Sequence, residues 1–329
     1  MSFYKGKYIT VTGGTGLIGR PLVKKLIDRG ANVRIVSLDD PSRAHPDAEF
    51  LHLNLTRFEN CMEACKGADF VFHLAGIKGS PAMTAKQPAS FFVPTILFNT
   101  NMMEAAYQSN IKRYLFTSTI GVYSPSKVFY EDDVWKTFPS ENDRFAGWAK
   151  RMGELQAEAY KIQYNWEDIA IVRPANVYGP YDNFDPKNAM VIPALIKRAL
   201  DGENPLKVWG DGSPIRDFIN ADDVAEGMIL ALEKGTGKPI NLGSGIGVSI
   251  KEIVNIIVNN MDKKPEILWD TSKPSGDKKR LMDISRAKAI GFKPKISIEE
   301  GIKQVMNWYQ QNKEIIDKRY NVFTEEKLA

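Results

Sequence analysis

The stretch Tyr8-Ile-Thr-Val-Thr-Gly-Gly-Thr-Gly-Leu-Ile-Gly19 decides the fold of the amino-terminal half. It opens with β-branched and apolar residues that are typical of a short buried strand, and apolar residues then recur at helical spacing from Leu17 to Arg29. The glycines between them allow a tight turn and let backbone N–H groups approach a pyrophosphate, whose charge the helix amino terminus favours. Because the glycines stand between a strand and a helix, the stretch predicts a dinucleotide-binding turn.

Strand and helix patterns continue to alternate after this turn. The pattern predicts strands at 8–11, 33–36, 50–55, 69–74, 113–117 and 169–173, and helices at 17–29, 58–66, 90–109 and 146–163. Such alternation with short connections indicates parallel βαβ units. We therefore predict an α/β fold, a doubly wound parallel sheet of Rossmann type with a smaller carboxyl-terminal α/β domain. The Rossmann domain is expected at 1–175 with a later return of about 216–245, and the second domain at 176–215 and 246–329.

The texture of the sequence changes after Arg173. Residues 174–190 and 202–218 are rich in Pro, Gly, Asn and Asp, which predicts long loops around a ligand. Further on, Ser249–Glu252 and Ser297–Glu300 have the pattern of capping boxes, so each is expected to open a helix.

Composition excludes several classes of protein. The 329 residues are 43% apolar and 26% charged, which is typical of a globular chain. A net charge of +4 without a basic block argues against nucleic acid as a partner. No apolar run approaches the roughly 20 residues of a membrane span, and the start of the sequence lacks a signal-peptide pattern, so we expect a cytoplasmic protein away from membranes. Cys61 and Cys65 have no neighbouring histidine, so we expect reduced, apolar cysteines and no metal site.

The second strand bears on the choice of cofactor. An acidic residue at its end would bond the adenosine ribose of NAD, and that place falls on Ser37, with Asp39 and Asp40 just beyond. Two carboxylates there would repel the 2′-phosphate of NADP, and Arg43 is six residues from Ser37. We therefore favour NAD over NADP. The alternative is that both aspartates only form a turn before Pro41.

Beyond the glycine turn, motifs along nearly the whole chain carry a family resemblance. They are Thr12–Gly19, His73–Gly76, Thr117–Thr119, Gly147–Lys150, Arg173–Pro180 and Gly212–Phe218. In this order they resemble the extended short-chain dehydrogenase/reductase family, which contains nucleotide-sugar epimerases, dehydratases and reductases. The carboxyl-terminal half is most similar to the GDP-fucose synthases of that family, through the segments Tyr178–Phe184, Val191–Leu195, Val208–Gly210 and Lys273–Gly276.

The resemblance implies roles for the matching residues. Lys150 would bond the nicotinamide ribose and lower the pKa of a catalytic tyrosine one helical turn earlier, and Thr119 would bond the same sugar hydroxyl as that tyrosine. The implied cofactor contacts are Gly13, Thr15, Gly16, Leu17, Ile18, Gly19, Asp39, Asn54, Leu55, Ala75, Gly76, Lys78, Thr117 and Lys150. The implied substrate contacts are Thr119, Asn176, Met190, Val191, Trp209, Arg216 and Arg280.

The catalytic tyrosine itself is missing, because Ala146 stands four residues before Lys150. An alanine cannot exchange a proton. Either this chain carries an alanine in place of a natural tyrosine, or the base has been lost or moved. We favour the replaced tyrosine because the surrounding motif is intact. Tyr123 and Tyr178 are the candidate substitutes.

Other missing groups narrow the reaction that the resemblance allows. Ile120 and Gly121 stand where the family's dehydratases and decarboxylases carry acids, and these two positions and Met190 stand where GDP-fucose synthases carry a cysteine and a histidine. What remains is oxidation or reduction at the sugar C4. The expected function is an NAD-dependent 4-epimerase of a GDP- or UDP-linked sugar, and the alternatives are a 4-ketoreductase or 4-dehydrogenase and a catalytically silent binding protein. By resemblance, helices 90–109 and 146–163 would form a homodimer interface.

Overall fold

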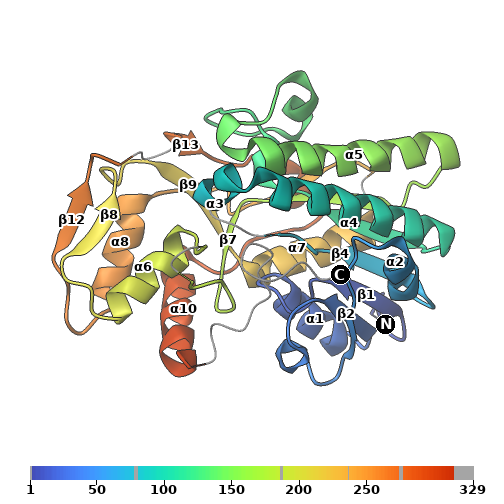
Figure 1. The fold of residues 1–329 in the computed structure, drawn as a ribbon, viewed down its shortest axis with the longest axis horizontal. Coiled ribbons are helices and arrows are strands. Elements are labelled where there is room, and N and C mark those ends of the chain that lie inside the picture. The colour runs from blue at the N-terminus through green and yellow to red at the C-terminus, as the bar shows by residue number, and fades with distance from the viewer. Residues whose placement is uncertain (1, 78–80, 186–187, 236, 274–276, 315–329) are drawn as a thin grey trace.

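A seven-stranded parallel sheet forms the centre of the molecule (Figure 1). The computed structural model describes residues 2–77, 81–185, 188–235, 237–273 and 277–314. The strands lie in the order β10-β6-β5-β4-β1-β2-β3. Their bounds are β1 (Tyr8–Thr12), β2 (Asn32–Ser37), β3 (Glu49–His52), β4 (Phe70–His73), β5 (Arg113–Thr117), β6 (Ile169–Pro174) and β10 (Ile240–Leu242). The strand order reverses between β1 and β4, and such switch points form ligand crevices beyond the carboxyl ends of the strands. The predicted fold class is confirmed.

Helices cover both faces of this sheet. On one face, α1 (Gly19–Asp28) and α7 (Ala221–Lys234) contact each other and share one apolar core with the strands. On the other face, α2 (Phe58–Cys65), α4 (Pro88–Gln108) and α5 (Arg144–Tyr164) contribute to a second core. The helices α4 and α5 run side by side, as Figure 1 shows. Two cores separated by one sheet are what a doubly wound fold requires.

A second region, with its own apolar core, is built from later parts of the chain. A four-stranded sheet contains β7 (Asn176–Tyr178), β9 (Ile215–Asn220), β11 (Gly247–Ser249) and β13 (Lys279–Arg280), and β8 (Leu206–Trp209) pairs with β12 (Ile267–Asp270). Its main helices are α6 (Val191–Leu200), α8 (Ile250–Asn259) and α10 (Ile298–Asn312). Between these segments the chain goes back to the large sheet through α7 and β10, although β9 belongs to the smaller sheet. The domain boundaries given above stay a prediction.

The short elements complete the chain. They are the helices α3 (Pro81–Lys86) and α9 (Ser285–Ala289) and the 3₁₀ turns η1 (Pro41–Arg43), η2 (Ile120–Val122), η3 (Glu131–Lys136) and η4 (Glu141–Asp143). The capping box that begins α8 is confirmed in both directions. At the start of α10, the Ser297 side chain accepts a hydrogen bond from the Glu300 N–H. Within the described part of the chain, no helix has the length and apolar character needed to cross a bilayer.

One local prediction was wrong. The predicted loops at 174–190 and 202–218 contain the strands β7, β8 and the start of β9. These strands are only three to six residues long and stand among prolines and glycines, so alternation is hard to detect in them. The predicted helix at 90–109 is α4, which begins at Pro88 and contains Pro94 in its interior.

Candidate active site

The glycine turn between β1 and α1 is shaped by contacts that exclude side chains. Gly13 has φ +68°, and a Cβ atom there would lie 3.1 Å from the Ala75 backbone nitrogen. A Cβ on Gly19 would overlap the Gly13 carbonyl oxygen. Within the turn, the Gly16 N–H donates to that carbonyl at 3.0 Å. Only glycine therefore fits at the two ends of the turn, as a close approach between backbone and pyrophosphate requires.

The Thr15 hydroxyl ties this turn to the second strand. Its oxygen lies 2.7 Å from Ser37 Oγ and donates at 2.7 Å to the Asp39 carboxylate. Arg43 Nε lies 3.8 Å from the same carboxylate, because the short turn η1 brings Arg43 back toward β2. The sequence argument against NADP relied on Arg43 being six residues from Ser37. Because the structure brings Arg43 close to Asp39, that argument is weakened.

Other predicted cofactor residues surround the same edge. Leu17 and Leu55 are buried, and Ile18 occupies the N-cap position of α1 without a capping hydrogen bond from its side chain. The Ala75 N–H donates to the Thr12 hydroxyl at 3.0 Å, whereas the side-chain oxygen of Asn54 accepts from Thr56.

Asp40 caps η1 by accepting from the Ser42 N–H, which confirms the turn interpretation for this one aspartate. Gly76 is exposed. Lys78 lies outside the described residues.

We call Thr119, Ala146, Lys150, Asn99 and His73 the acid–base corner. Thr119 follows β5 and accepts a hydrogen bond from the Gly121 N–H at 3.2 Å, and Ala146 and Lys150 lie one turn apart on α5. Lys150 Nζ lies 3.4 Å from Asn99 Oδ1 on α4 and 5.0 Å from the centre of the Phe116 ring. Burial lowers the pKa of Lys150 to about 7, and the charge of Glu154 partly opposes that shift.

Asn99, which contacts His73, is the part of the corner that sequence reasoning missed. His73 Nε2 lies 3.0 Å from Asn99 Oδ1, and Nδ1 lies 2.9 Å from the Thr12 hydroxyl. Burial, and then the charge of Lys150, lower the pKa of His73 to about 3, so the ring is neutral. His73 is therefore a neutral, hydrogen-bonded residue at the end of β4. The available signal was an asparagine in the middle of an apolar helix, between Phe98 and Met102.

Two buried polar atoms indicate that this edge can hold a polar ligand. Neither Asn99 Nδ2 nor Thr117 Oγ1 has a hydrogen-bond partner among the residues that the structure describes. Buried polar atoms in proteins are rarely left without a partner. Together with the glycine turn, whose ends leave no room for a side chain, these atoms fit a dinucleotide lying across the carboxyl ends of β1, β4 and β5.

The predicted substrate residues lie on the smaller sheet and its helices. Arg216 on β9 and Arg280 on β13 are direct neighbours in the strand pairing. Arg280 Nη1 lies 2.8 Å from the Asp143 carboxylate and Nη2 lies 2.5 Å from Asp277, whose carbonyl accepts from Arg216 at 2.6 Å. Asp143 precedes α5, so this ion pair joins the smaller sheet to the acid–base corner. Sequence reasoning did not single out Asp143.

The remaining substrate candidates are more loosely placed. Asn176 donates its amide to the Asp217 carbonyl at 2.8 Å, and the Trp209 side chain at the end of β8 is 64% exposed. Met190 and Val191 lie at the start of α6. The exposed indole of Trp209 can stack on a nucleotide base, whereas the Asn176 amide is already hydrogen-bonded to the Asp217 carbonyl.

A family model, "NAD dependent epimerase/dehydratase family", matches residues 9–243. The chain belongs to this family. It is 31% identical over 319 residues to GDP-L-fucose synthase 1 of Arabidopsis thaliana, with 94% of each chain covered. It is 28% identical to the GDP-L-fucose synthase of Escherichia coli strain K12, with 93% of this chain and 97% of that chain covered. A solved UDP-N-acetylglucosamine 4-epimerase from Methanobrevibacter ruminantium M1 matches with a TM-score of 0.83 and 28% identity, covering 94% of this chain and 99% of that chain.

Position 146 holds alanine rather than tyrosine, and neither candidate substitute, Tyr123 or Tyr178, is placed to act as a base. Tyr123 is buried, and its hydroxyl lies 2.6 Å from Asn241 Oδ1 and 3.0 Å from the Arg173 guanidinium. Tyr178 is also buried, and its ring would collide with a side chain at position 301 of α10. Burial raises the pKa of both phenols well above 10, so neither can act as a base near neutral pH.

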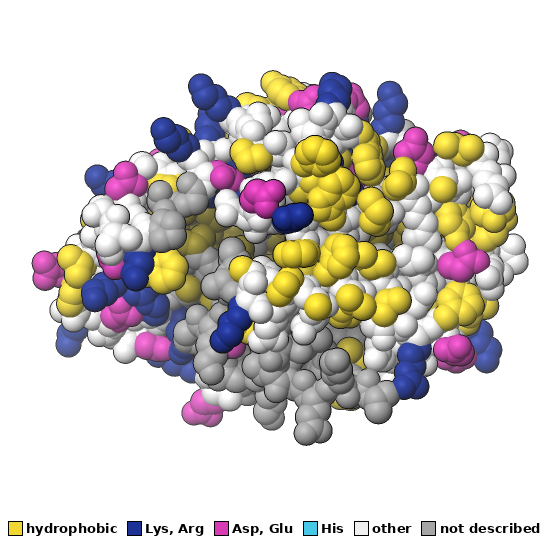
Figure 2. All heavy atoms as spheres, turned by 45° about the horizontal axis from the view of Figure 1, so that its top comes forward, with side chains coloured by type: hydrophobic (Ala, Val, Ile, Leu, Met, Phe, Trp, Pro, Cys, Tyr) yellow, Lys and Arg dark blue, Asp and Glu magenta, His cyan; other side chains and the backbone are white. Residues whose placement is uncertain are grey.

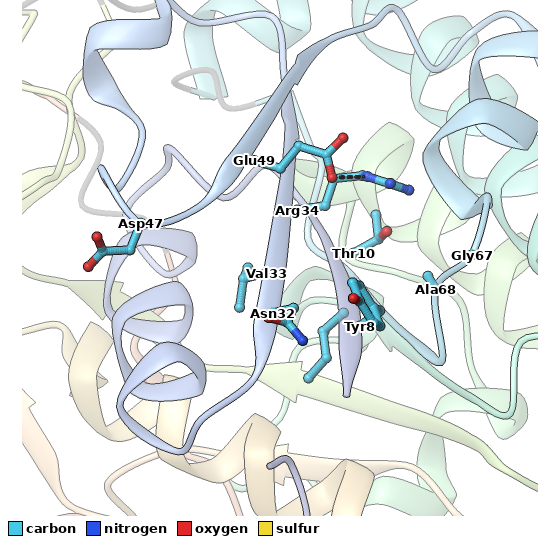
Figure 3. Close-up of a pocket in the computed structure, with 10 residues that line it drawn as sticks. Tyr8, Thr10, Asn32, Val33, Arg34, Asp47, Glu49, Gly67 and Ala68 are labelled. Atoms are coloured by element: carbon cyan, nitrogen blue, oxygen red, sulfur yellow. Dashed lines mark hydrogen bonds and ion pairs between the residues drawn. The ribbon is translucent and has the colours of Figure 1, made fainter. Parts of the chain in front are cut away.

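Other chemistry-bearing features lie outside the family's site. In the described part of the chain, no group of three His, Cys, Asp or Glu side chains is arranged to hold a metal ion. Cys61 and Cys65 are free and buried, and burial raises the pKa of both thiols. A hollow of about 240 Å³ lies at the amino end of β1, the end opposite the glycine turn, and the Arg34–Glu49 ion pair crosses its rim (Figure 3). None of the predicted site residues lines it.

Proposed function

We propose that this protein is an NAD-dependent nucleotide-sugar 4-epimerase that oxidises C4 of the sugar to a 4-keto intermediate and then reduces it again. The arrangement that carries the proposal is the acid–base corner on α4 and α5, which the Asp143–Arg280 ion pair at the start of α5 links to the arginines of the smaller sheet. Arg216 and Arg280 supply the guanidinium donors that recognise a diphosphate. A sugar on that diphosphate would extend toward Thr119.

The groups that are missing restrict the reaction. Ile120, Gly121 and Met190 cannot transfer protons, so the reactions at C3, C5 and C6 lack their acids and bases. The structure does bring Asp143 against Gly121, since its Cβ lies 3.2 Å from where a Cβ on that glycine would be. The Asp143 carboxylate is paired with Arg280, which commits it to the smaller sheet. Hydride exchange at C4 is therefore the chemistry that these residues support.

The chain's own residues would hold the dinucleotide in a defined orientation. Backbone N–H groups of the glycine turn would hold the pyrophosphate, Asp39 would accept from the adenosine ribose, and Lys150 and the Thr117 hydroxyl would bind toward the nicotinamide. When bound, the nicotinamide ring accepts a hydride from the sugar carbon and later gives it back. We favour NAD because the Asp39 carboxylate faces the ribose position, although Arg43 beside it would help to accept a 2′-phosphate.

A one-way 4-ketoreductase is the second candidate. Its support is the 31% identity to a GDP-L-fucose synthase over nearly the whole chain. The substrate would then be a GDP-linked sugar rather than a UDP-linked one. A catalytically silent binding protein is the third candidate, supported by Ala146 alone.

The contents of the purified protein separate these candidates. The protein is denatured by heat, and the supernatant is run on an ion-exchange column against NAD, NADP, UDP-sugar and GDP-sugar standards. Nearly one NAD per chain supports the epimerase, because a self-recycling cofactor is retained. An exchangeable NADP supports the reductase. Turnover is then tested with UDP-glucose, UDP-N-acetylglucosamine and GDP-mannose for the unaltered chain and for Ala146→Tyr. A lack of turnover by both proteins on every sugar contradicts the enzyme proposal.

We also propose that the protein is a homodimer through α4 and α5. Figure 2 shows hydrophobic side chains gathered on the face that these helices form. Val93 and Leu97 on α4 and Leu155 and Ile162 on α5 are exposed, and a monomer would leave them in water. Leu155→Asp should convert a dimer into a monomer in light scattering after gel filtration. Ile246→Asp, a charge at a more exposed apolar residue outside these helices, is the control and should leave the mass unchanged.

A further inference from the structure

Ala146 raises the question of which group takes the proton from the sugar hydroxyl. Most ionisable groups near the acid–base corner are already committed. Glu154 binds the Arg173 guanidinium through both carboxylate oxygens, at 2.6 and 2.9 Å, and accepts from the Ser118 hydroxyl at 2.5 Å. Asp143 is paired with Arg280. Both nitrogens of His73 are hydrogen-bonded, and its pKa of about 3 keeps the ring from accepting a proton near neutral pH.

Lys150 is the exception. Among the described residues, no carboxylate lies within ion-pair distance of its Nζ, and its one hydrogen bond, to Asn99 Oδ1, is long at 3.4 Å. A phenolate at position 146 would neutralise its charge, but the alanine side chain ends at Cβ. The amine thus has a free lone pair when it is neutral, and it lies one helical turn from the vacant phenol position.

We propose that Lys150 itself is the acid–base group of this chain and does the work that a tyrosine at position 146 would otherwise do. The inference rests on the proposed function, and it takes the second explanation for Ala146, a base that has moved. The hydroxyl of the sugar gives its proton to the neutral Nζ, directly or through one water molecule, and Nζ becomes an ammonium group. The C–H electron pair leaves as the hydride that the nicotinamide ring accepts, and a C=O bond forms. The return step reverses each transfer.

The surroundings of Nζ favour the neutral amine that this step needs. Nζ and the neutral His73 on β4 both contact the uncharged amide of Asn99 on α4, and Nζ also lies over the ring of Phe116 on β5. Glu154, one turn along α5, is the nearby anion, and Arg173 largely neutralises it. Burial therefore dominates and brings the pKa of Lys150 to about 7. A base with a pKa near the working pH combines a useful neutral fraction with a useful driving force.

A labelling experiment tests the ionisation of Lys150 without using activity. The purified protein is treated with trace acetic anhydride from pH 5 to 10, and the extent of labelling at each lysine is read by mass spectrometry. The Lys150 midpoint should lie at least two pH units below that of Lys127, an exposed lysine. In Ala146→Tyr the Lys150 midpoint should rise, because a phenol that ionises beside it favours the ammonium form. Equal midpoints for Lys150 and Lys127 would overturn the proposal.

A variant cycle tests the role in catalysis, with UDP-glucose, UDP-N-acetylglucosamine and GDP-mannose as probes. Lys150→Arg keeps the cation but cannot lose its proton near neutral pH. It should lower turnover at least 100-fold in the unaltered chain and at least tenfold less in Ala146→Tyr, where the cation only has to assist a phenol. Equal losses in both backgrounds contradict the proposal.

Two further outcomes separate the inference from the function on which it rests. Asp143→Asn should lower turnover less than Lys150→Arg does, and the reverse order assigns the proton transfer to the carboxylate and overturns the proposal. If no sugar turns over in any variant, the proposed function fails, and the labelling midpoint still decides whether Lys150 is a neutral amine near pH 7.

Discussion

The glycine turn and the acid–base corner lie at the same edge of the sheet, but they are built differently. In the glycine turn, backbone atoms meet backbone atoms, and a Cβ at Gly13 or Gly19 would contact them closely or overlap them. In the acid–base corner, the side chains of His73 on β4 and Lys150 on α5 meet at Asn99 on α4, and Ala146 can stand at the expected tyrosine position within an otherwise matching motif. The first region is constrained by shape and the second by chemistry, so chemistry can change while the fold and the cofactor turn stay the same.

The largest effect is expected in the glycine turn itself. Gly19→Ala places a methyl group on the Gly13 carbonyl oxygen, so the turn must move, and we expect a loss of more than about 4 kcal/mol of stability together with dinucleotide binding. Urea unfolding and NAD titration by calorimetry measure both quantities. Gly76→Ala is the control, since its nearest atom would be 3.8 Å away, and stability should change by under about 0.5 kcal/mol. If the Gly19→Ala protein were stable and bound NAD, the glycine turn would not be constrained by shape as we describe.

The next effect concerns the ion pair behind the acid–base corner. Glu154→Gln leaves the buried Arg173 without its anion, and we expect a loss of about 3–5 kcal/mol in urea unfolding. Asp28→Asn, which removes an exposed pair with Lys24, is the matched control and should change stability far less, because water screens that pair. Equal losses for the two variants would mean that burial of the Arg173 pair has no special weight.

A smaller effect should appear as a dependence of stability on acid. His73 has a pKa of about 3 in the folded protein and about 6.5 when unfolded, so below pH 6.5 the unfolded chain binds a proton that the folded protein does not. The contribution to stability should fall as the pH drops from 6.5 toward 3, by up to about 1.4 kcal/mol per pH unit. His73→Gln cannot titrate, so its stability curve from pH 6 to 4 should be flatter. Parallel curves for the two proteins would show that His73 is charged or exposed.

The smallest effect is expected at the hydrogen-bonded contact between the glycine turn and the end of β2. Thr15→Val keeps the shape of the side chain but removes its bonds to Ser37 and Asp39, which we expect to cost about 1–2 kcal/mol. The same change at the exposed Thr100 is the control and should be close to neutral. Identical results at the two positions would indicate that the hydroxyl does not secure the turn.

The sequence was sufficient for the architecture and for the glycine turn, because both follow from local patterns. Periodicity located every strand of the large sheet up to β6, and the glycine spacing located the turn. Contacts between distant residues could not be predicted in this way. Spacing gave no reason to pair Asn99 with His73 or Asp143 with Arg280. Counting Arg43 as six residues from Ser37 did not predict its approach to Asp39. The roles implied for the individual site residues stay predictions that the experiments above address.

The contact of Arg280 with Asp143 and Asp277 has a consequence for how a substrate would enter. Two carboxylates already satisfy this guanidinium, so a diphosphate does not meet a bare positive charge but has to exchange with them. Binding would then be an anion exchange within the protein, with little net release of ions to solvent. We expect substrate affinity to depend only weakly on salt concentration. We also expect the Asp143–Arg280 ion pair between the start of α5 and β13 to break when the substrate binds.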